Sequence, residues 1–130
     1  MAHPNEDLIR TAYAAYARGD IDLVRQKFLA PDIRGHYPGT SPLAGHHQGA
    51  DTVAEFLGLR GQLSGGTHRL ELHDVLADDG HVVALHTARA ERAGRVLEIT
   101  EAMVFHIVDG KVAEVWTLNT DPQAVDEFWS

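Results

Sequence analysis

The chain has 130 residues, of which 44% are hydrophobic and 23% are charged, and its formal net charge is −8. A chain this negative repels phosphate backbones and anionic headgroups, so neither a nucleic acid nor a membrane surface is expected as a partner. Because the sequence contains no cysteine, disulfide bonds, thiol nucleophiles and cysteine-ligated metals are excluded. Length and composition fit one globular domain, expected over residues 1–130.

The sequence carries no recognisable targeting, membrane or cofactor-binding motif. Its first residues, MAHPNEDLIR, lack the basic and apolar regions of a secretory signal, and no apolar run approaches the roughly 20 residues of a membrane span. A cytoplasmic protein is therefore expected. There is no glycine-rich phosphate loop, and the nine histidines form no His-x-His or His-x-x-x-His pair, so we expect neither a cofactor nor a metal.

The first half of the chain predicts three helices. The first is expected over residues 5–19, with Tyr13 and Tyr16 on one face at helical spacing. A second, shorter helix is expected over residues 20–30, and a third over residues 51–63.

The segment GHYPGTSPLAGHHQG, residues 35–49, has no periodicity. It contains four glycines, two prolines and three histidines. A short strand over residues 32–37 is expected to lead into it and to stop at Pro38-Gly39. The rest of the segment is expected to be a loop.

From residue 67 onward the apolar residues alternate with a period of two. Turn signals at Asp79-Gly80, Ala93-Gly94 and Asp109-Gly110 divide this part into four strands of an antiparallel meander. Residues 122–129 have the spacing of a short amphipathic helix. Helices segregated from an antiparallel sheet predict the α+β class.

The turns also predict which residues lie side by side. A two-residue turn at Ala93-Gly94 places His86 opposite Glu101, and the turn after it places Met103 opposite Trp116. One face of the sheet then carries most of the large side chains, and we assign it to a cavity beneath the helices. The side chains expected on this face are Val82, Ala84, His86, Ile99, Glu101, Met103, Phe105, Glu114, Trp116 and Leu118.

His86 and Glu101 are the strongest candidates for chemistry. An imidazole paired with an acid among apolar side chains can exchange a proton near neutral pH, which is general acid/base chemistry. A buried structural pair is the alternative interpretation. His73 joins His86 only if its strand is regular, whereas the odd step to Val75 indicates a bulge near Asp74.

The opposite face of the sheet is predicted to be flat and to carry small or β-branched side chains. A contiguous apolar surface of this kind usually marks an interface, so a homodimer through this face is expected. The side chains expected there are Val83, Leu85, Thr87, Thr100, Ala102, Val104, Val115 and Thr117.

Four segments resemble a known family. They are YAAYARGDIDLVRQKFLAPDIRGHYPG, SPLAGHHQGADTVAEFL, HDVLADDGHVVAL and FHIVDGKVAEVW, which follow in order over nearly the whole chain. In these segments the chain resembles the SnoaL-like polyketide cyclases and the wider ketosteroid-isomerase-like proteins of the nuclear transport factor two superfamily. The resemblance implies a cone-shaped, curved antiparallel sheet wrapped around N-terminal helices, enclosing an apolar pocket with residues 35–49 at its rim.

The catalytic residues of these relatives do not carry over. By this resemblance Ala12 stands nearest the isomerase tyrosine, one residue from Tyr13. Met103 stands where the acidic donor of the isomerases would be, and at about the position of the cyclase aspartate. His36 or Tyr37 falls where the isomerase base would be.

The sequence therefore predicts a cofactor-independent enzyme of the isomerase, cyclase or dehydratase (lyase) kind, acting by general acid/base catalysis on a small hydrophobic, oxygenated molecule. A non-catalytic ligand-binding or dimerisation module of the same fold is the alternative. A third hypothesis is an epoxide hydrolase, because Arg89-x-Glu91 resembles half of the motif of limonene-epoxide-hydrolase-like relatives. The candidate catalytic residues are His86, Glu101 and His36, and the candidate substrate-binding residues are Tyr13, Tyr16, Tyr37, Phe56, Met103, Phe105, Trp116 and Leu118.

Overall fold

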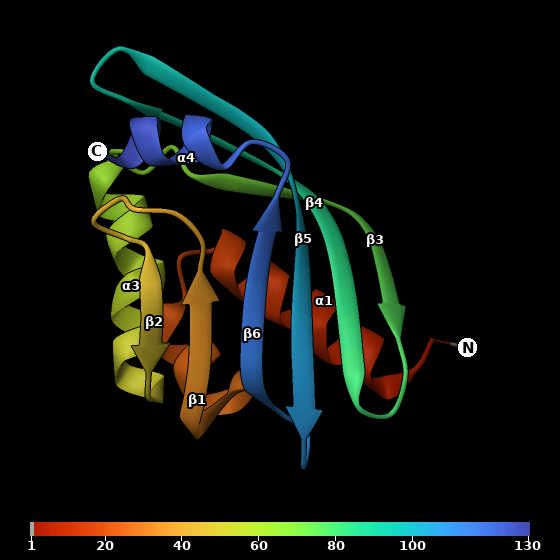
Figure 1. The fold of residues 1–130 in the computed structure, drawn as a ribbon. Helices are drawn as coiled ribbons and strands as arrows, with labels where there is room; N and C mark the ends of the chain where they lie inside the picture. The colour runs from red at the N-terminus through yellow and green to blue at the C-terminus, as the bar shows by residue number, and fades with distance from the viewer. Residues whose placement is uncertain (1) are drawn as a thin grey trace.

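A single curved sheet, not closed into a barrel, carries the helices α1 and α3 on one side (Figure 1). The computed structural model describes residues 2–130. Helices on one face of a largely antiparallel sheet make the fold α+β, as the sequence predicted. The elements are α1 (Pro4–Ala17), α2 (Ile21–Leu23), the π-helix η1 (Val24–Phe28), β1 (Leu29–Tyr37), β2 (Gly45–Gln48), α3 (Ala50–Leu63), β3 (Arg69–Ala77), β4 (His81–Arg92), β5 (Arg95–Val108), β6 (Lys111–Asn119) and α4 (Pro122–Trp129).

The six strands are arranged in the order β2-β1-β6-β5-β4-β3. The expected meander of β3 to β6 is confirmed, with antiparallel pairing throughout. The sheet as a whole is mixed, because the chain returns from the meander so that β6 lies parallel to β1. β1 also pairs with β2, at the edge of the sheet.

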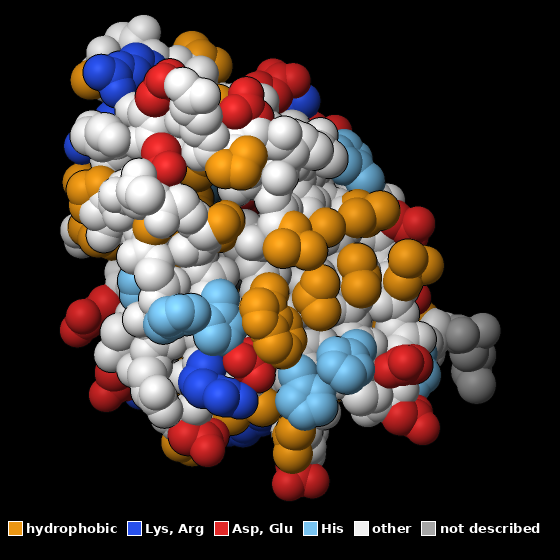
Figure 2. Space-filling view, viewed as in Figure 1, with side chains coloured by type: hydrophobic (Ala, Val, Ile, Leu, Met, Phe, Trp, Pro, Cys, Tyr) orange, Lys and Arg blue, Asp and Glu red, His pale blue; other side chains and the backbone are white. Residues whose placement is uncertain are grey.

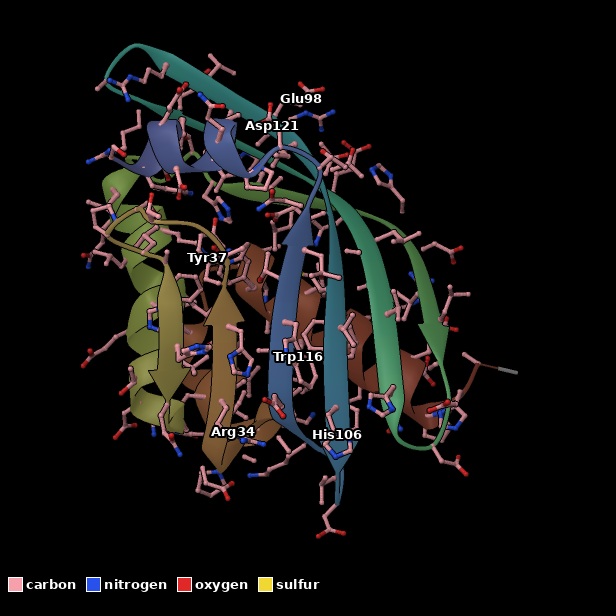
Figure 3. The ribbon with its side chains drawn as sticks, viewed as in Figure 1. Arg34, Tyr37, Glu98, His106, Trp116 and Asp121 are labelled. Carbon is pink, nitrogen blue, oxygen red and sulfur yellow. The ribbon has the colours of Figure 1, made fainter. Side chains whose placement is uncertain are left out.

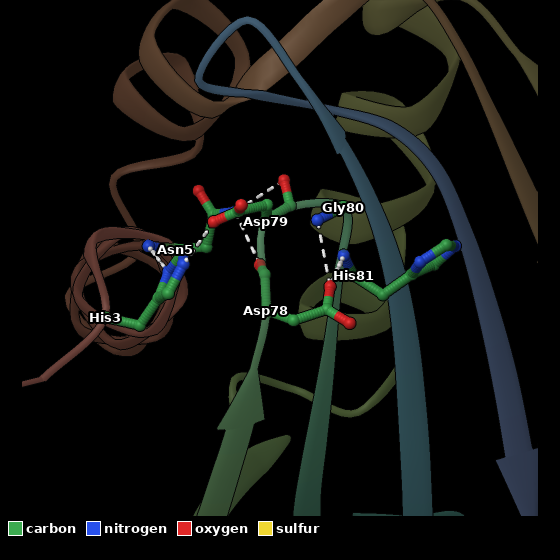
Figure 4. A network of polar contacts seen from close by, with 6 residues as sticks. All are labelled: His3, Asn5, Asp78, Asp79, Gly80 and His81. Carbon is green, nitrogen blue, oxygen red and sulfur yellow. Dashed lines mark hydrogen bonds and ion pairs between the residues drawn. The ribbon is translucent and has the colours of Figure 1, made fainter.

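The start of α1 is tied to the turn between β3 and β4 (Figure 4). The helix begins one residue earlier than expected, because His3 Nδ1 accepts the Asn5 amide at 3.0 Å. The Asn5 side chain instead donates to the backbone oxygens of Asp78 and Asp79, at 3.0 and 3.3 Å. The Asp78 carboxylate in turn accepts the Gly80 amide at 2.9 Å, which fixes the turn.

The second helix and the segment after it differ from expectation. After one short α-turn the chain forms η1, and β1 then begins at Leu29 and runs through Pro31. The pairing of β1 with β6 is irregular between Leu29 and Arg34, so the missing N–H of Pro31 interrupts no regular ladder. Residues 35–49 are not all loop, because β2 lies within them.

The register of β4 and β5 is the one that the sequence predicted. Ala93 and Gly94 have φ values of 51° and 77°, as a type I′ turn requires. The pairing continues without a bulge from Arg92 opposite Arg95 to the far end of the hairpin. His86 therefore lies opposite Glu101.

The expected pairing of Met103 with Trp116 is wrong by one residue. The β5–β6 register holds as far as Ile107 and then shifts, leaving Ala113 as an extra residue in β6. Beyond this bulge Met103 lies opposite Thr117. Because neighbouring strand residues point to opposite faces, the faces assigned to β6 are exchanged. Val115 and Thr117 face the helices, whereas Glu114, Trp116 and Leu118 lie on the outer face of the sheet.

The bulge expected in β3 is confirmed. Leu72 pairs with His86 and Asp74 pairs with Leu85, so His73 is the extra residue. The His73 ring lies on the outer face, with its Nε2 at 2.7 Å from the Thr87 hydroxyl.

Two apolar clusters fill the space between the sheet and the helices. The larger contains Phe28, Ile33 and Val82 beneath α1, and the other contains Phe128 and Trp129 of α4. Within residues 2–130, no helix combines the length and the apolar character needed to cross a bilayer.

Substitution of Ile33 tests where the apolar core lies. Its side chain is 0% exposed, so Ile33→Ala is expected to lower the free energy of unfolding by about 2–4 kcal/mol through lost burial and a residual cavity. Val96, which is 73% exposed, is the matched control. Val96→Ala should change the free energy of unfolding by less than about 0.5 kcal/mol. Urea titration measures both values. Equal effects of the two substitutions would contradict the assigned core.

Candidate functional site

A cavity of about 120 Å³ lies between the sheet and helices α1 and α3. Cavities of roughly this size hold one small ring. Its walls are mostly apolar, with a few polar groups converging on them, as in binding sites for small molecules. The polar side chains that border it are Tyr13, Tyr16, Tyr37, His47, Arg60, His86 and Thr117.

Two buried side chains and the half-buried Tyr13, from three elements, form one hydrogen-bonded chain at this cavity. His86 Nε2 lies 2.9 Å from Glu101 Oε1, and His86 Nδ1 lies 2.7 Å from the Tyr13 hydroxyl. His86 and Glu101 are only 1% and 3% exposed. The β4–β5 register aligns the first pair, and α1 presents Tyr13 to the second nitrogen of the ring.

The electrostatics of Tyr13 indicate the direction of these hydrogen bonds. Burial and the charge of Glu101 raise the pKa of Tyr13 well above its ordinary value, although the charge of Arg60 opposes this shift. Tyr13 therefore keeps its proton and can donate it to His86 Nδ1. A carboxylate can only accept, so Glu101 takes a hydrogen from His86 Nε2, and a neutral ring then presents Nδ1 as the acceptor of the Tyr13 hydroxyl.

A second phenol–imidazole pair lies nearby. The hydroxyl of Tyr16, one turn after Tyr13 on α1, is 2.7 Å from His68 Nδ1. Burial, and then the positive charge of Arg60 and the proximity of His86, lower the pKa of His68 to about 2. His68 is therefore a neutral hydrogen-bond partner of Tyr16.

Arg60 brings a buried positive charge to the cavity. Its side chain extends from α3, is 5% exposed and lies over the rings of Tyr16 and Phe56, at 5.5 and 4.9 Å from their centres. Burial lowers its pKa, but Tyr16, Tyr37 and Glu101 together outweigh burial and leave the pKa raised. The guanidinium thus stays charged inside the protein.

Several of the predicted binding residues lie at the cavity. Tyr37 is 6% exposed, its ring centre is 5.1 Å from that of Phe56, and burial raises its pKa to about 12. Its hydroxyl lies near Arg60 and Trp129, but no well-formed hydrogen bond joins them. The predicted residues that border the cavity are Tyr13, Tyr16, His36, Tyr37, Phe56, His86, Met103 and Phe105.

His36, Trp116 and Leu118 are placed differently from expectation. The His36 imidazole points away from the cavity that its strand borders, and its Nε2 is 2.6 Å from Glu114 Oε2 on the outer face. It stacks on Trp116, with 5.6 Å between the ring centres. Trp116 is labelled on β6 in Figure 3. Leu118 is 55% exposed on the same face. For Trp116 and Leu118 the cause is the bulge at Ala113; for His36 it is the alternation of β1.

The pair Arg89 and Glu91 lies away from the cavity. Arg89 is exposed and bonds Glu71 and Glu98, and Glu91 is also exposed. The epoxide-hydrolase hypothesis therefore finds no counterpart in the cavity. Within residues 2–130, no cluster of three or more His, Cys, Asp or Glu side chains is arranged to hold a metal ion.

Sequence reasoning missed Arg60 and His68. Arg60 falls on the inward stripe of α3 with Val53, Phe56 and Leu57, so helical spacing was the signal that could have found it. His68 precedes β3 and follows no pattern, and only its contact with Tyr16 identifies it.

Comparison with known proteins gives a family match over most of the chain. The model described as "SnoaL-like domain" matches residues 9–115. The uncharacterized protein Rv0034 of Mycobacterium tuberculosis is 39% identical over 125 residues, which are 95% of each chain.

Solved structures share the fold. Bal32a, from a soil-derived mobile gene cassette, has a TM-score of 0.93 and 34% identity, covering 98% of this chain and 97% of its own. A protein of unknown function with a cystatin-like fold from Xanthomonas campestris has a TM-score of 0.88 and 26% identity, covering 95% of this chain and 96% of its own.

His68 makes stability depend on pH. Because its pKa is lowered to about 2 in the folded state, the unfolded chain binds the extra proton below about pH 6.5, and this part of the stability is lost as the pH falls. Between pH 7 and pH 5 the free energy of unfolding should fall by up to about 2 kcal/mol through this residue. Urea titrations of the wild type and His68→Asn measure the difference, and parallel pH profiles would contradict the assignment.

Proposed function

The chain belongs to the SnoaL-like family, and from that premise we propose that it is an enzyme of the isomerase, cyclase or lyase kind that moves protons through Tyr13, His86 and Glu101. The observation that carries the proposal is the continuous chain of hydrogen bonds from the buried Glu101 through His86 to Tyr13 at the cavity.

The proposed reaction begins with the removal of a proton next to a substrate carbonyl. The substrate proton passes to the Tyr13 oxygen while the Tyr13 proton passes to His86 Nδ1. The products are an enolate, a neutral Tyr13 and an imidazolium, so one proton has moved at each step and the charge balances. Return of the proton to another carbon completes an isomerisation; attack of the enolate on a second carbonyl, or loss of a leaving group, gives a cyclisation or an elimination.

Glu101 acts through His86 rather than on the substrate. Its carboxylate accepts from Nε2 and stabilises the imidazolium that forms when Nδ1 takes a proton. Because both groups are buried, they are held in one geometry and water does not compete for the hydrogen bond. Glu101 is therefore a positioning residue in this proposal.

The cavity favours a single-ring substrate. About 120 Å³ accommodates one small ring, and Met103 and Phe105 of β5 contribute apolar wall. A suitable probe is 3-cyclohexen-1-one, whose conversion to the conjugated 2-cyclohexen-1-one needs only a proton shift and is followed by ultraviolet absorbance.

The wild type is expected to accelerate this conversion over buffer. His86→Gln and Tyr13→Phe should each lower kcat by about 100-fold or more, because each interrupts proton transfer. His73→Gln is the matched control, since this imidazole lies on the outer face and should leave kcat unchanged. Glu101→Gln should lower kcat and alter its pH profile.

Two outcomes would contradict the proposal. One is a wild type that does not exceed the buffer rate. The other is equal loss of activity in the His73 and His86 variants, since a proton relay depends on the buried imidazole alone. Circular dichroism and thermal unfolding of each variant separate loss of chemistry from loss of fold.

We also propose a homodimer through the outer face of β3 to β6. An apolar patch lies there (Figure 2), and Leu76 and Leu118 within it are 57% and 55% exposed. A second copy meets this patch without bringing charges together at its centre, which suits a self-complementary interface. The apolar patch consists of Leu76, Val83, Leu85, Ala102, Val104, Trp116 and Leu118.

A charge placed in the apolar patch tests the dimer. Leu118→Glu should convert the dimer to a monomer, because the carboxylate would be buried without a partner. Val96→Glu adds the same charge at an exposed position near the β4–β5 turn and should leave the dimer intact. Light scattering coupled to size-exclusion chromatography measures the mass, and a monomeric wild type would overturn the proposal.

A further inference from the structure

Arg60 is a buried charge that the proton relay does not use. It is 5% exposed, and none of the ion pairs among residues 2–130 includes it. The Tyr37 hydroxyl lies near the guanidinium without a well-formed hydrogen bond to it, and the buried Nε has no partner among residues 2–130. A buried arginine is normally paired, so this one lacks the group that would compensate it.

The surroundings of Arg60 compensate its charge only in part. The rings of Tyr16 and Phe56 lie against the guanidinium, at 5.5 and 4.9 Å, and cation–π contacts of this kind are individually weak. The charge of Glu101 acts on Arg60 through space, but the Glu101 carboxylate is hydrogen-bonded to His86 and forms no direct ion pair with the guanidinium. His68, which lies near, has its pKa lowered partly by Arg60 and so brings no second positive charge.

The guanidinium borders the cavity in which the proposed reaction takes place. Its planar fork of donors fits a carboxylate by two parallel hydrogen bonds. One guanidinium in an apolar cavity of about 120 Å³ matches one carboxylate better than a phosphate, which needs more donors. An oxyanion that exists only during the reaction would leave the buried charge uncompensated for the rest of the cycle.

We propose that Arg60 binds a carboxylate of the substrate, and that the cavity therefore takes a small, single-ring carboxylic acid. This inference rests on the proposed function for its claim that the bound anion is a substrate. Held by its carboxylate at Arg60 on α3, the ring would lie across the cavity toward Tyr13 on α1, which is the proton-transferring end of the site.

Binding of two matched probes tests the inference without any assay of turnover. Benzoate and benzamide have nearly the same shape, but only benzoate carries a charge. Calorimetric titration should show benzoate binding at least about 10-fold more tightly than benzamide, as expected for a charge-assisted pair. The inference is overturned if the two probes bind equally well. It is also overturned if benzoate shows no binding even at ten times the highest benzamide concentration tested.

Arg60→Met is the informative variant, because it keeps much of the side-chain volume and removes the charge. It should lower benzoate affinity by about 10-fold or more, and change benzamide affinity by less than about 3-fold. Its Tm without ligand should be unchanged or higher, since an uncompensated buried charge is removed. A structural role for Arg60 predicts the opposite, a large fall in Tm with benzoate binding retained in whatever protein is folded.

Two further measurements keep the result independent of folding and of catalysis. In the wild type, the Arg60 Nε–H resonance should shift with benzoate and not with benzamide; no shift with benzoate would overturn the inference. His86→Gln should keep benzoate affinity within about 3-fold, because it interrupts the relay and leaves Arg60 in place. Benzoate binding without turnover would thus reject only the proposed function, and turnover of the neutral ketone without benzoate binding would reject only this inference.

Discussion

The uninterrupted pairing of β4 with β5 is the constraint on which the candidate site depends. Every residue of β4 keeps the register that the Ala93-Gly94 turn sets, so His86 and Glu101 stand side by side on the face that the helices cover. A slip of one residue would turn one of them to the outer face and break the pair. The two neighbouring pairings do contain bulges, and both lie outside this hairpin.

The sequence predicted most of the fold, and it predicted this pair, because turn chemistry alone determines the register of a regular hairpin. The same reasoning failed for β6. Ala113 bulges without a glycine or proline to indicate it, and one extra residue exchanged the faces of Trp116 and Thr117. The bulge at His73 was predictable, since the alternation of leucines breaks before Val75. β2 was not, because its four residues form a strand only through pairing with β1.

Only some of the polar side chains at the cavity could be predicted from the sequence. Tyr13 and Tyr16 follow from helical spacing, but Arg60 has the residue type of a solvated helix face and lies buried instead. A buried unpaired charge lowers stability, and proteins retain such charges at functional sites. In the two proposals, the relay on one side of the cavity moves a proton, and the guanidinium on another side binds the substrate.

The protonation pattern of His86 is the most direct test of this account. Two-dimensional ¹⁵N NMR of the histidine side chains separates a protonated ring nitrogen from an unprotonated one. The account predicts a hydrogen on Nε2, shared with Glu101, and an unprotonated Nδ1 that accepts the Tyr13 hydroxyl. A hydrogen on Nδ1 with Nε2 unprotonated would reverse the chain of hydrogen bonds and contradict the proposed proton relay.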